Sequence, residues 1–187
     1  MRDRWAAVQR PWRLAARGAG CGALLLGAVV VEGAWGWRLG WMGGAPEPVL
    51  VVLLALGLRM QPEGAALLGF LAGLLQDLAG GGALGVFAMS KLWVGFGAGS
   101  LARTVVLDSA WAPSAFAVAG TAAARLLEVG LSALAGDPPP SLLAWARGTA
   151  VAACYNGLIA PLVFAGLRKV ERWRGRLRLA TSPELRP

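Results

Sequence analysis

The chain has 187 residues, of which 57% are hydrophobic and 15% charged, and it carries a net charge of +8. Several apolar stretches exceed what the core of one soluble domain could bury, so the composition predicts an integral membrane protein. The positive charge lies mostly at the two ends, which favours membrane orientation and anionic lipid over nucleic acid as its role. The chain has no histidine, which excludes Ser-His and Cys-His relays and removes most transition-metal sites.

The first predicted segment, residues 1–18, is basic and has tryptophan and aliphatic side chains at helical spacing. This pattern fits a short amphipathic helix on the cytoplasmic membrane surface, and a disordered basic lead fits it nearly as well. The first membrane helix is expected at about 19–41, with Glu32 inside it and tryptophans clustered toward its outer end. A short external turn is expected at 43–48.

The second predicted helix, 49–60, is unusually short for a membrane span. At about 1.5 Å per residue it does not cover a hydrocarbon core of about 30 Å, so it must include its flanks or thin the membrane locally. The last helix is expected to kink at Pro161. The four helices that follow the second are expected at 64–79, 83–102, 112–134 and 142–167.

The distribution of lysine and arginine predicts the topology. Most of them fall on one side of six alternating helices, which places both termini in the cytoplasm. The predicted domains are a basic N-terminal segment 1–18, a six-helix transmembrane domain 19–167 and a basic cytoplasmic tail 168–187. The tail interleaves basic and apolar residues, which fits contact with anionic phospholipid. A cytoplasmic protein partner is the alternative that the spacing leaves open.

The helices at 64–79 and 83–102 flank three glycines and carry small residues at a spacing of four. On a helix this spacing lines up one face, so the two stripes predict a closely packed antiparallel hairpin. We therefore expect an intramembrane ion pair between Asp77 and Lys91, with glycines facing one another beneath it. One register gives every pairing, namely Asp77 with Lys91, Gly73 with Gly95, Gly69 with Gly99 and Ala65 with Arg103.

Ionisable residues within the predicted helices form a polar layer. An isolated charge costs about 2.5 to 3.5 kcal/mol or more at the bilayer centre, so these side chains should face inward and pair. Two of them, three residues apart in one helix, can contact each other. The layer is either a binding cavity or proton path, or a structural network that fixes helix register, which we favour because the charges nearly cancel. Its members are Glu32, Asp77, Lys91, Arg125 and Glu128.

Other candidate motifs do not predict an active site. Gly95, Gly97 and Gly99 have the spacing of a dinucleotide loop, but they lie in an apolar helix with no strand before it. Asp77 has no second carboxylate, nucleophile or set of metal ligands beside it in the hairpin. We therefore expect no catalytic residue, no cofactor and no metal.

A recognisable motif lies in the hairpin. One helix ends in Gly-Leu-Leu-Gln-Asp at 73–77, and a glycine-bearing turn then leads to Leu84 and Gly85 before the next apolar helix. This stretch, 69–99, resembles the signature of the MreD family of bacterial rod-shape-determining membrane proteins. The chain length, the six-helix layout and the short loops are similar as well.

The resemblance implies a multi-pass protein of the bacterial inner membrane with no established catalytic activity. It implies MreC as a partner and, directly or through MreC, RodA and a class B penicillin-binding protein. It also implies a fold similar to the substrate-binding component of energy-coupling-factor transporters. We predict a non-enzymatic scaffold of the cell-elongation (rod) complex that supports peptidoglycan synthesis and cell shape. The alternative is a vitamin-binding transporter component, in which Glu32, Asp77 or Arg125 would contact a small ligand.

Overall fold

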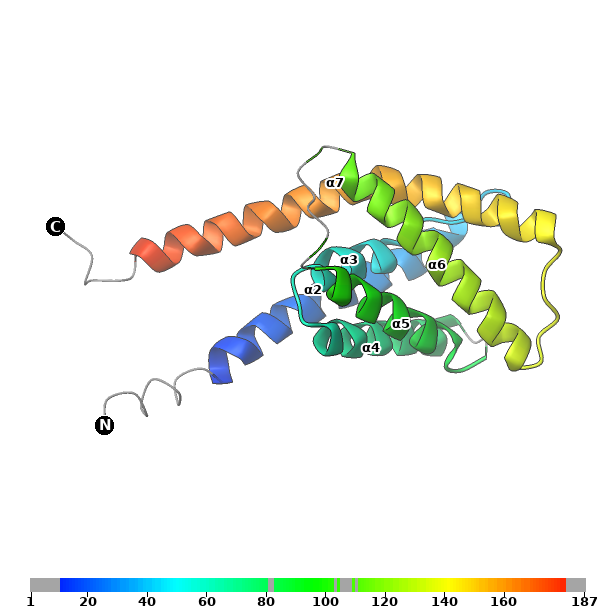
Figure 1. The fold of residues 1–187 in the computed structure, drawn as a ribbon, viewed down its shortest axis with the longest axis horizontal. Coiled ribbons are helices and arrows are strands. Elements are labelled where there is room, and N and C mark those ends of the chain that lie inside the picture. The colour runs from blue at the N-terminus through cyan, green and yellow to red at the C-terminus, as the bar shows by residue number, and fades with distance from the viewer. Residues whose placement is uncertain (1–10, 81–82, 103, 105–108, 110, 181–187) are drawn as a thin grey trace.

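The structure is a computed structural model. It describes residues 11–80, 83–102, 104, 109 and 111–180. The described part belongs to the all-helical class predicted from the sequence. Its helices, labelled in Figure 1, are α2 (Pro11–Leu39), α3 (Pro48–Gly57), α4 (Pro62–Gly80), α5 (Val86–Leu101), α6 (Ala112–Leu134) and α7 (Leu142–Ala180).

Two of these helices are long and apolar enough to cross a membrane. They are α6, over Ala112–Leu134, and α7, over Leu142–Trp173. Three shorter apolar helices lie at Gly20–Ala34, Pro48–Gly57 and Val86–Leu101. The predicted bounds of 112–134 for one helix are confirmed by α6, which begins next to Pro113 in its first turn.

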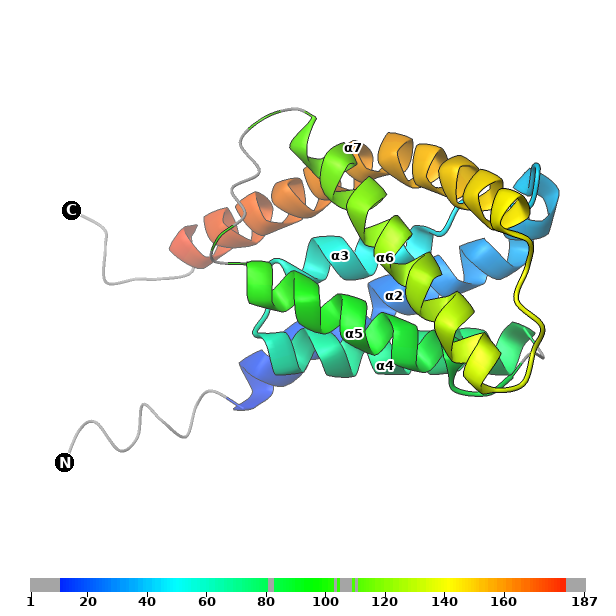
Figure 2. The same ribbon diagram turned by 45° about the vertical axis from the view of Figure 1, so that its right-hand side comes forward.

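The helices alternate in direction along the chain (Figures 1 and 2). The connections at 40–47 and 135–141 therefore lie at one end of the bundle, which we call the loop end. The first turns of α2 and the last turns of α7 both project from the opposite end (Figure 1). Helices α4 and α5 lie side by side as a hairpin, and α6 crosses beside α5 on its way to the loop end (Figure 2).

Helix α3 lies in the middle of the bundle and contacts each of the other described helices. Leu50, Val51 and Leu53 are completely buried, and α3 contributes residues to all three apolar clusters of the core. A helix that is apolar on every side must be covered by other protein or by lipid, and other helices cover α3. The segment that was short for a membrane span is therefore the core of the fold, and its 10 residues measure about 15 Å.

The outer helices extend past the predicted bounds of the membrane domain. Helix α2 begins at Pro11, before residue 19, and α7 continues past 167 to Ala180. Pro161 lies inside α7, and the helix changes direction along its length (Figure 2). The described part of the predicted tail thus continues α7, while residues 1–10 and 181–187 lie outside the described residues.

The segment before α3, where an external turn is predicted at 43–48, lies at the loop end and is largely buried. Gly44 and Pro46 are buried, and Glu47 is only 7% exposed. The cause is close packing on α7, because a Cβ at Gly44 would lie 2.4 Å from the Gly148 carbonyl oxygen. Glycine lets the two backbones touch, and this contact turns the chain back into the bundle.

Glycines allow the backbones of α4 and α5 to touch. A Cβ at Gly69 would lie 2.1 Å from the Lys91 carbonyl oxygen, and one at Gly73 would lie 2.2 Å from that of Phe87. A Cβ added at Gly95 would likewise lie 2.4 Å from the Ala65 carbonyl oxygen. Small residues at four-residue spacing let the backbones of neighbouring helices come into direct contact.

The register of the hairpin differs from the predicted one. Gly69 faces the backbone of Lys91 and not Gly99, and Ala65 faces Gly95, so the predicted pairing is wrong by about two helical turns. Arg103, the predicted partner of Ala65, lies outside the described residues. The error has a physical reason, because a four-residue repeat brings small residues together in several registers and does not select one.

We expect Gly73→Ala to destabilise the protein, because its methyl group would meet the Phe87 carbonyl oxygen and force α4 and α5 apart. Overpacking of this kind lowers the free energy of unfolding by about 1–3 kcal/mol. Gly97→Ala is the matched control, because an added Cβ there has nothing within 4 Å. Thermal unfolding in detergent measures both variants, and equal losses of stability would contradict the close packing of the hairpin.

Candidate functional site

Asp77 joins α4 to the start of α5. Its buried carboxylate accepts hydrogen bonds from the backbone N–H groups of Gly85, Phe87 and Ala88, each at 3.0 Å. The first N–H groups of a helix have no partner within it, and negative charge is favoured there. The predicted ion pair with Lys91 is therefore wrong, because the shifted register places Asp77 at the N-terminus of α5.

Lys91 instead begins a row of alternating charges. Its buried Nζ lies 3.5 Å from Glu128 Oε1 on α6. Glu128 Oε2 lies 3.7 Å from Arg125 Nη1, the contact expected from their spacing, and Arg125 Nη2 lies 2.5 Å from Glu47 Oε1. We call Lys91, Glu128, Arg125 and Glu47 the charge chain. It connects α5 and α6 to the segment before α3, and its alternating signs offset the cost of removing each charge from water.

Neutral hydrogen bonds extend the charge chain to α7. The backbone N–H of Glu47 donates to Asn156 Oδ1, and Asn156 Nδ2 donates to Thr121 Oγ1, both at 2.9 Å. The Thr121 hydroxyl donates to the Ala117 carbonyl at 2.7 Å. These buried bonds tie α7 and α6 to the start of α3.

Glu32 holds the N-terminal end of α3. Its carboxylate accepts hydrogen bonds from the backbone N–H of Val49 at 3.2 Å and from the Gln76 side chain. Within the described residues, no lysine or arginine nitrogen forms an ion pair with Glu32 or Asp77. Hydrogen bonds from N–H donors thus stabilise the carboxylates of Glu32 and Asp77.

Arg59 holds the C-terminal end of α3. Its guanidinium donates to the Ala55 carbonyl through Nη1, and its Nε lies 2.8 Å from Glu171 Oε1 on α7. The last carbonyls of a helix have no partner within it, and positive charge is favoured there. Negative charge therefore lies at the N-terminal end of α3 and positive charge at its C-terminal end, which is the arrangement that the helix dipole favours.

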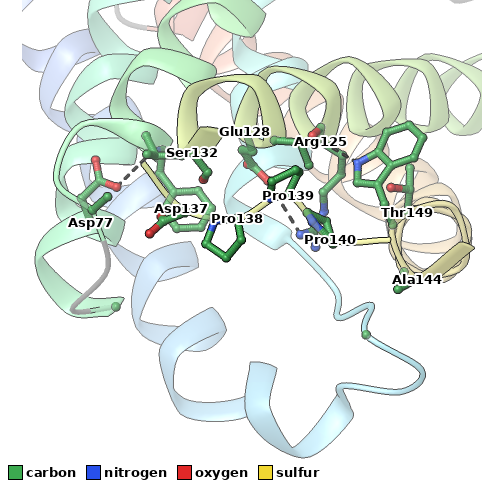
Figure 3. Close-up of a pocket in the computed structure, with 18 residues that line it drawn as sticks. Asp77, Arg125, Glu128, Ser132, Asp137, Pro138, Pro139, Pro140, Ala144 and Thr149 are labelled. Atoms are coloured by element: carbon green, nitrogen blue, oxygen red, sulfur yellow. Dashed lines mark hydrogen bonds and ion pairs between the residues drawn. The ribbon is translucent and has the colours of Figure 1, made fainter. Parts of the chain in front are cut away.

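A cavity of about 550 Å³ opens at the loop end. It brings together three of the predicted site residues, Asp77, Arg125 and Glu128, whereas Glu32 and Lys91 are outside its lining. Figure 3 shows Arg125 and Glu128 next to the three prolines that follow α6, with Asp77 farther to the left. The polar residues of the site therefore divide into the inner charge chain and a partly open cavity that reaches it.

Three polar residues of this region were not predicted as site residues: Glu47, Thr121 and Asn156. Glu47 lies between two prolines in a segment that has the sequence of an exposed turn. Its burial follows from tertiary packing, which local sequence does not encode. Thr121 and Asn156 do have a usable signal, because a polar side chain inside an apolar helix tends to bond a neighbouring helix.

We expect the buried pair of the charge chain to show strong coupling. Lys91→Met leaves Glu128 buried without one of its cations, and removing one partner of such a pair costs about 3–5 kcal/mol. Adding Glu128→Gln to Lys91→Met should cost less than the sum of the single changes. Unfolding of the four proteins in detergent gives the coupling energy.

The same cycle with Asp77→Asn in place of Glu128→Gln is the control. Asp77 and Lys91 share no hydrogen bond or ion pair, so their effects should be close to additive. A coupling as large as that of Lys91 with Glu128 would restore the sequence-based pairing and contradict the register of the structure.

Comparison with known families gives a match for most of the bundle. The model of the family described as rod shape-determining protein MreD matches residues 21–135, more than half of the chain. No curated protein and no solved structure matches the sequence. None of these findings supports the transporter alternative. The chain belongs to the MreD family of rod shape-determining proteins, a family of the bacterial inner membrane.

Proposed function

We propose that this protein is a non-enzymatic membrane scaffold of the cell-elongation (rod) complex. In this role it binds MreC and supports peptidoglycan synthesis and cell shape. The observation that carries the proposal is the family match over residues 21–135. RodA and a class B penicillin-binding protein are the further proposed partners, reached directly or through MreC.

The internal contacts support a scaffold because they occupy the polar side chains with other protein groups. Lys91, Arg125, Glu47 and Glu128 bond one another, and Asp77 is held by three backbone N–H groups. Groups restrained in this way set the positions of helices and make the bundle rigid. A rigid bundle can then present a constant surface to a partner.

We further propose that all six described helices are embedded in the membrane, with both termini cytoplasmic. An even number of alternating helices returns the chain to its starting side, in agreement with Figure 1. Arg59, Arg168, Lys169 and Arg172 lie on the last turns of α3 and α7 or just beyond them, at the end opposite the loop end. Basic residues are retained on the cytoplasmic side. In this topology the loop end is periplasmic and the charge chain is an intramembrane polar layer.

Anionic phospholipid is a proposed partner at the cytoplasmic end. A shallow cavity on α7 is lined by Arg168 and Arg172, one helical turn apart, together with Glu171 and Ala165. The ion pair between Arg59 and Glu171 anchors this part of α7 to α3. Two arginines at this spacing suit a phosphate group, and each basic residue near such a membrane contributes about 1 kcal/mol.

Copurification tests the scaffold. The tagged protein, expressed at its native level and solubilised gently, should recover MreC and the wall-synthesis enzymes, identified by mass spectrometry. The Gly73→Ala variant, which disturbs the hairpin, should recover less MreC than the Gly97→Ala control. Recovery of paired ATPases with a coupling subunit, or of a bound vitamin, would contradict the scaffold and favour a transporter component.

A further inference from the structure

The cavity at the loop end has the size and walls of a binding site. Its volume of about 550 Å³ falls within the range of about 300–1,000 Å³ typical of ligand sites. One wall is apolar and includes Val86, Phe87 and Val129, and the rim carries the three prolines 138–140 (Figure 3). Proline has no N–H group, so this part of the rim offers acceptors and no backbone donors.

The ionisable residues of the lining have an excess of negative charge. Asp77, Glu128 and Asp137 are acidic, and Arg125 is the basic residue among the described lining. Asp77 already accepts hydrogen bonds from the backbone of α5, and Glu128 already pairs with Lys91 in the charge chain. Asp137 bonds through its backbone N–H to the Ser132 carbonyl, and its carboxylate has no hydrogen bond or ion pair to any residue the structure describes. This rim carboxylate is therefore available to a cation.

Two polar atoms of the lining also lack partners. Arg125 Nε and Thr149 Oγ1 are buried and have no hydrogen-bond partner in the described part of the chain. They are closed off from solvent, so an occupant of the cavity does not reach them, and recognition depends on the acids and the apolar wall. An anion would meet the acidic excess of the lining. A lysine or arginine side chain matches the lining, because it combines an apolar stem with a cationic head.

We propose that this cavity docks a segment of a partner polypeptide through a lysine or arginine side chain. The apolar stem of that side chain packs on Phe87 and Val129, and its cationic head pairs with the exposed carboxylate of Asp137. The inference rests on the proposed function, because a scaffold requires a partner. It adds where the partner binds and which chemistry recognises it.

Site-specific photo-crosslinking in living cells tests the docking. A photoreactive phenylalanine analogue replaces Ala144, an exposed residue of the lining. The matched control places it at Leu158, which is 75% exposed on the same helix and outside the lining. We expect a protein adduct from position 144 and not from 158, and the crosslinked peptide should contain lysine or arginine.

The effect of charge on the crosslinking yield tests whether a cationic side chain docks in the cavity. Asp137→Asn should lower its yield by up to about fivefold, the effect of removing one partner of an exposed charge pair. Glu63→Gln, which changes an exposed acid in the first turn of α4 at the opposite end of the bundle, should leave the yield unchanged. Because Asp137 is exposed, Asp137→Asn should keep the unfolding temperature of the wild type.

Each of three results would overturn the docking: no protein adduct at position 144, an adduct that does not respond to Asp137→Asn, or a crosslinked peptide without a basic residue. Copurification separates this failure from failure of the scaffold. If the wild-type chain still recovers MreC, only the docking is wrong. If it recovers no partner of the rod complex, the scaffold itself is wrong.

Discussion

The burial of a short helix is the constraint on which the rest of this structure depends. Helix α3 is apolar on all sides, too short to cross a membrane and almost completely buried by the other helices. Helix ends leave N–H and carbonyl groups without partners, and an apolar environment supplies none. Glu32 and Arg59 provide those partners from outside the helix. The surrounding helices are thereby fixed at defined positions along α3.

The polar residues of the interior have a structural role that follows from the same constraint. A buried charge is unfavourable unless an opposite charge or several donors face it. The charge chain meets this requirement by joining α5, α6 and the start of α3, and Asp77 meets it at the start of α5. Both specify which helices are neighbours. The cavity at the loop end lies where these contacts stop and the bundle opens.

The sequence predicted the features that local pattern controls. It gave the helical class, the bounds of α6, the small-residue faces of the hairpin and the contact between Arg125 and Glu128. It did not give the hairpin register, because a four-residue repeat fits several alignments and the cap by Asp77 selects among them. It also missed Glu47, which is buried only because Gly44 packs on α7. Long-range packing determines the hairpin register and the burial of Glu47, and no short sequence pattern encodes that packing.

Hydrogen exchange of the protein in lipid nanodiscs, followed by mass spectrometry, tests the central position of α3 most directly. If α3 is the core, the amides from Val51 to Leu56 should exchange most slowly, because only global unfolding exposes them. The projecting last turns of α7 should exchange much faster and serve as the internal reference. Exchange of α3 as fast as those turns would contradict an account in which the short buried helix organises the fold.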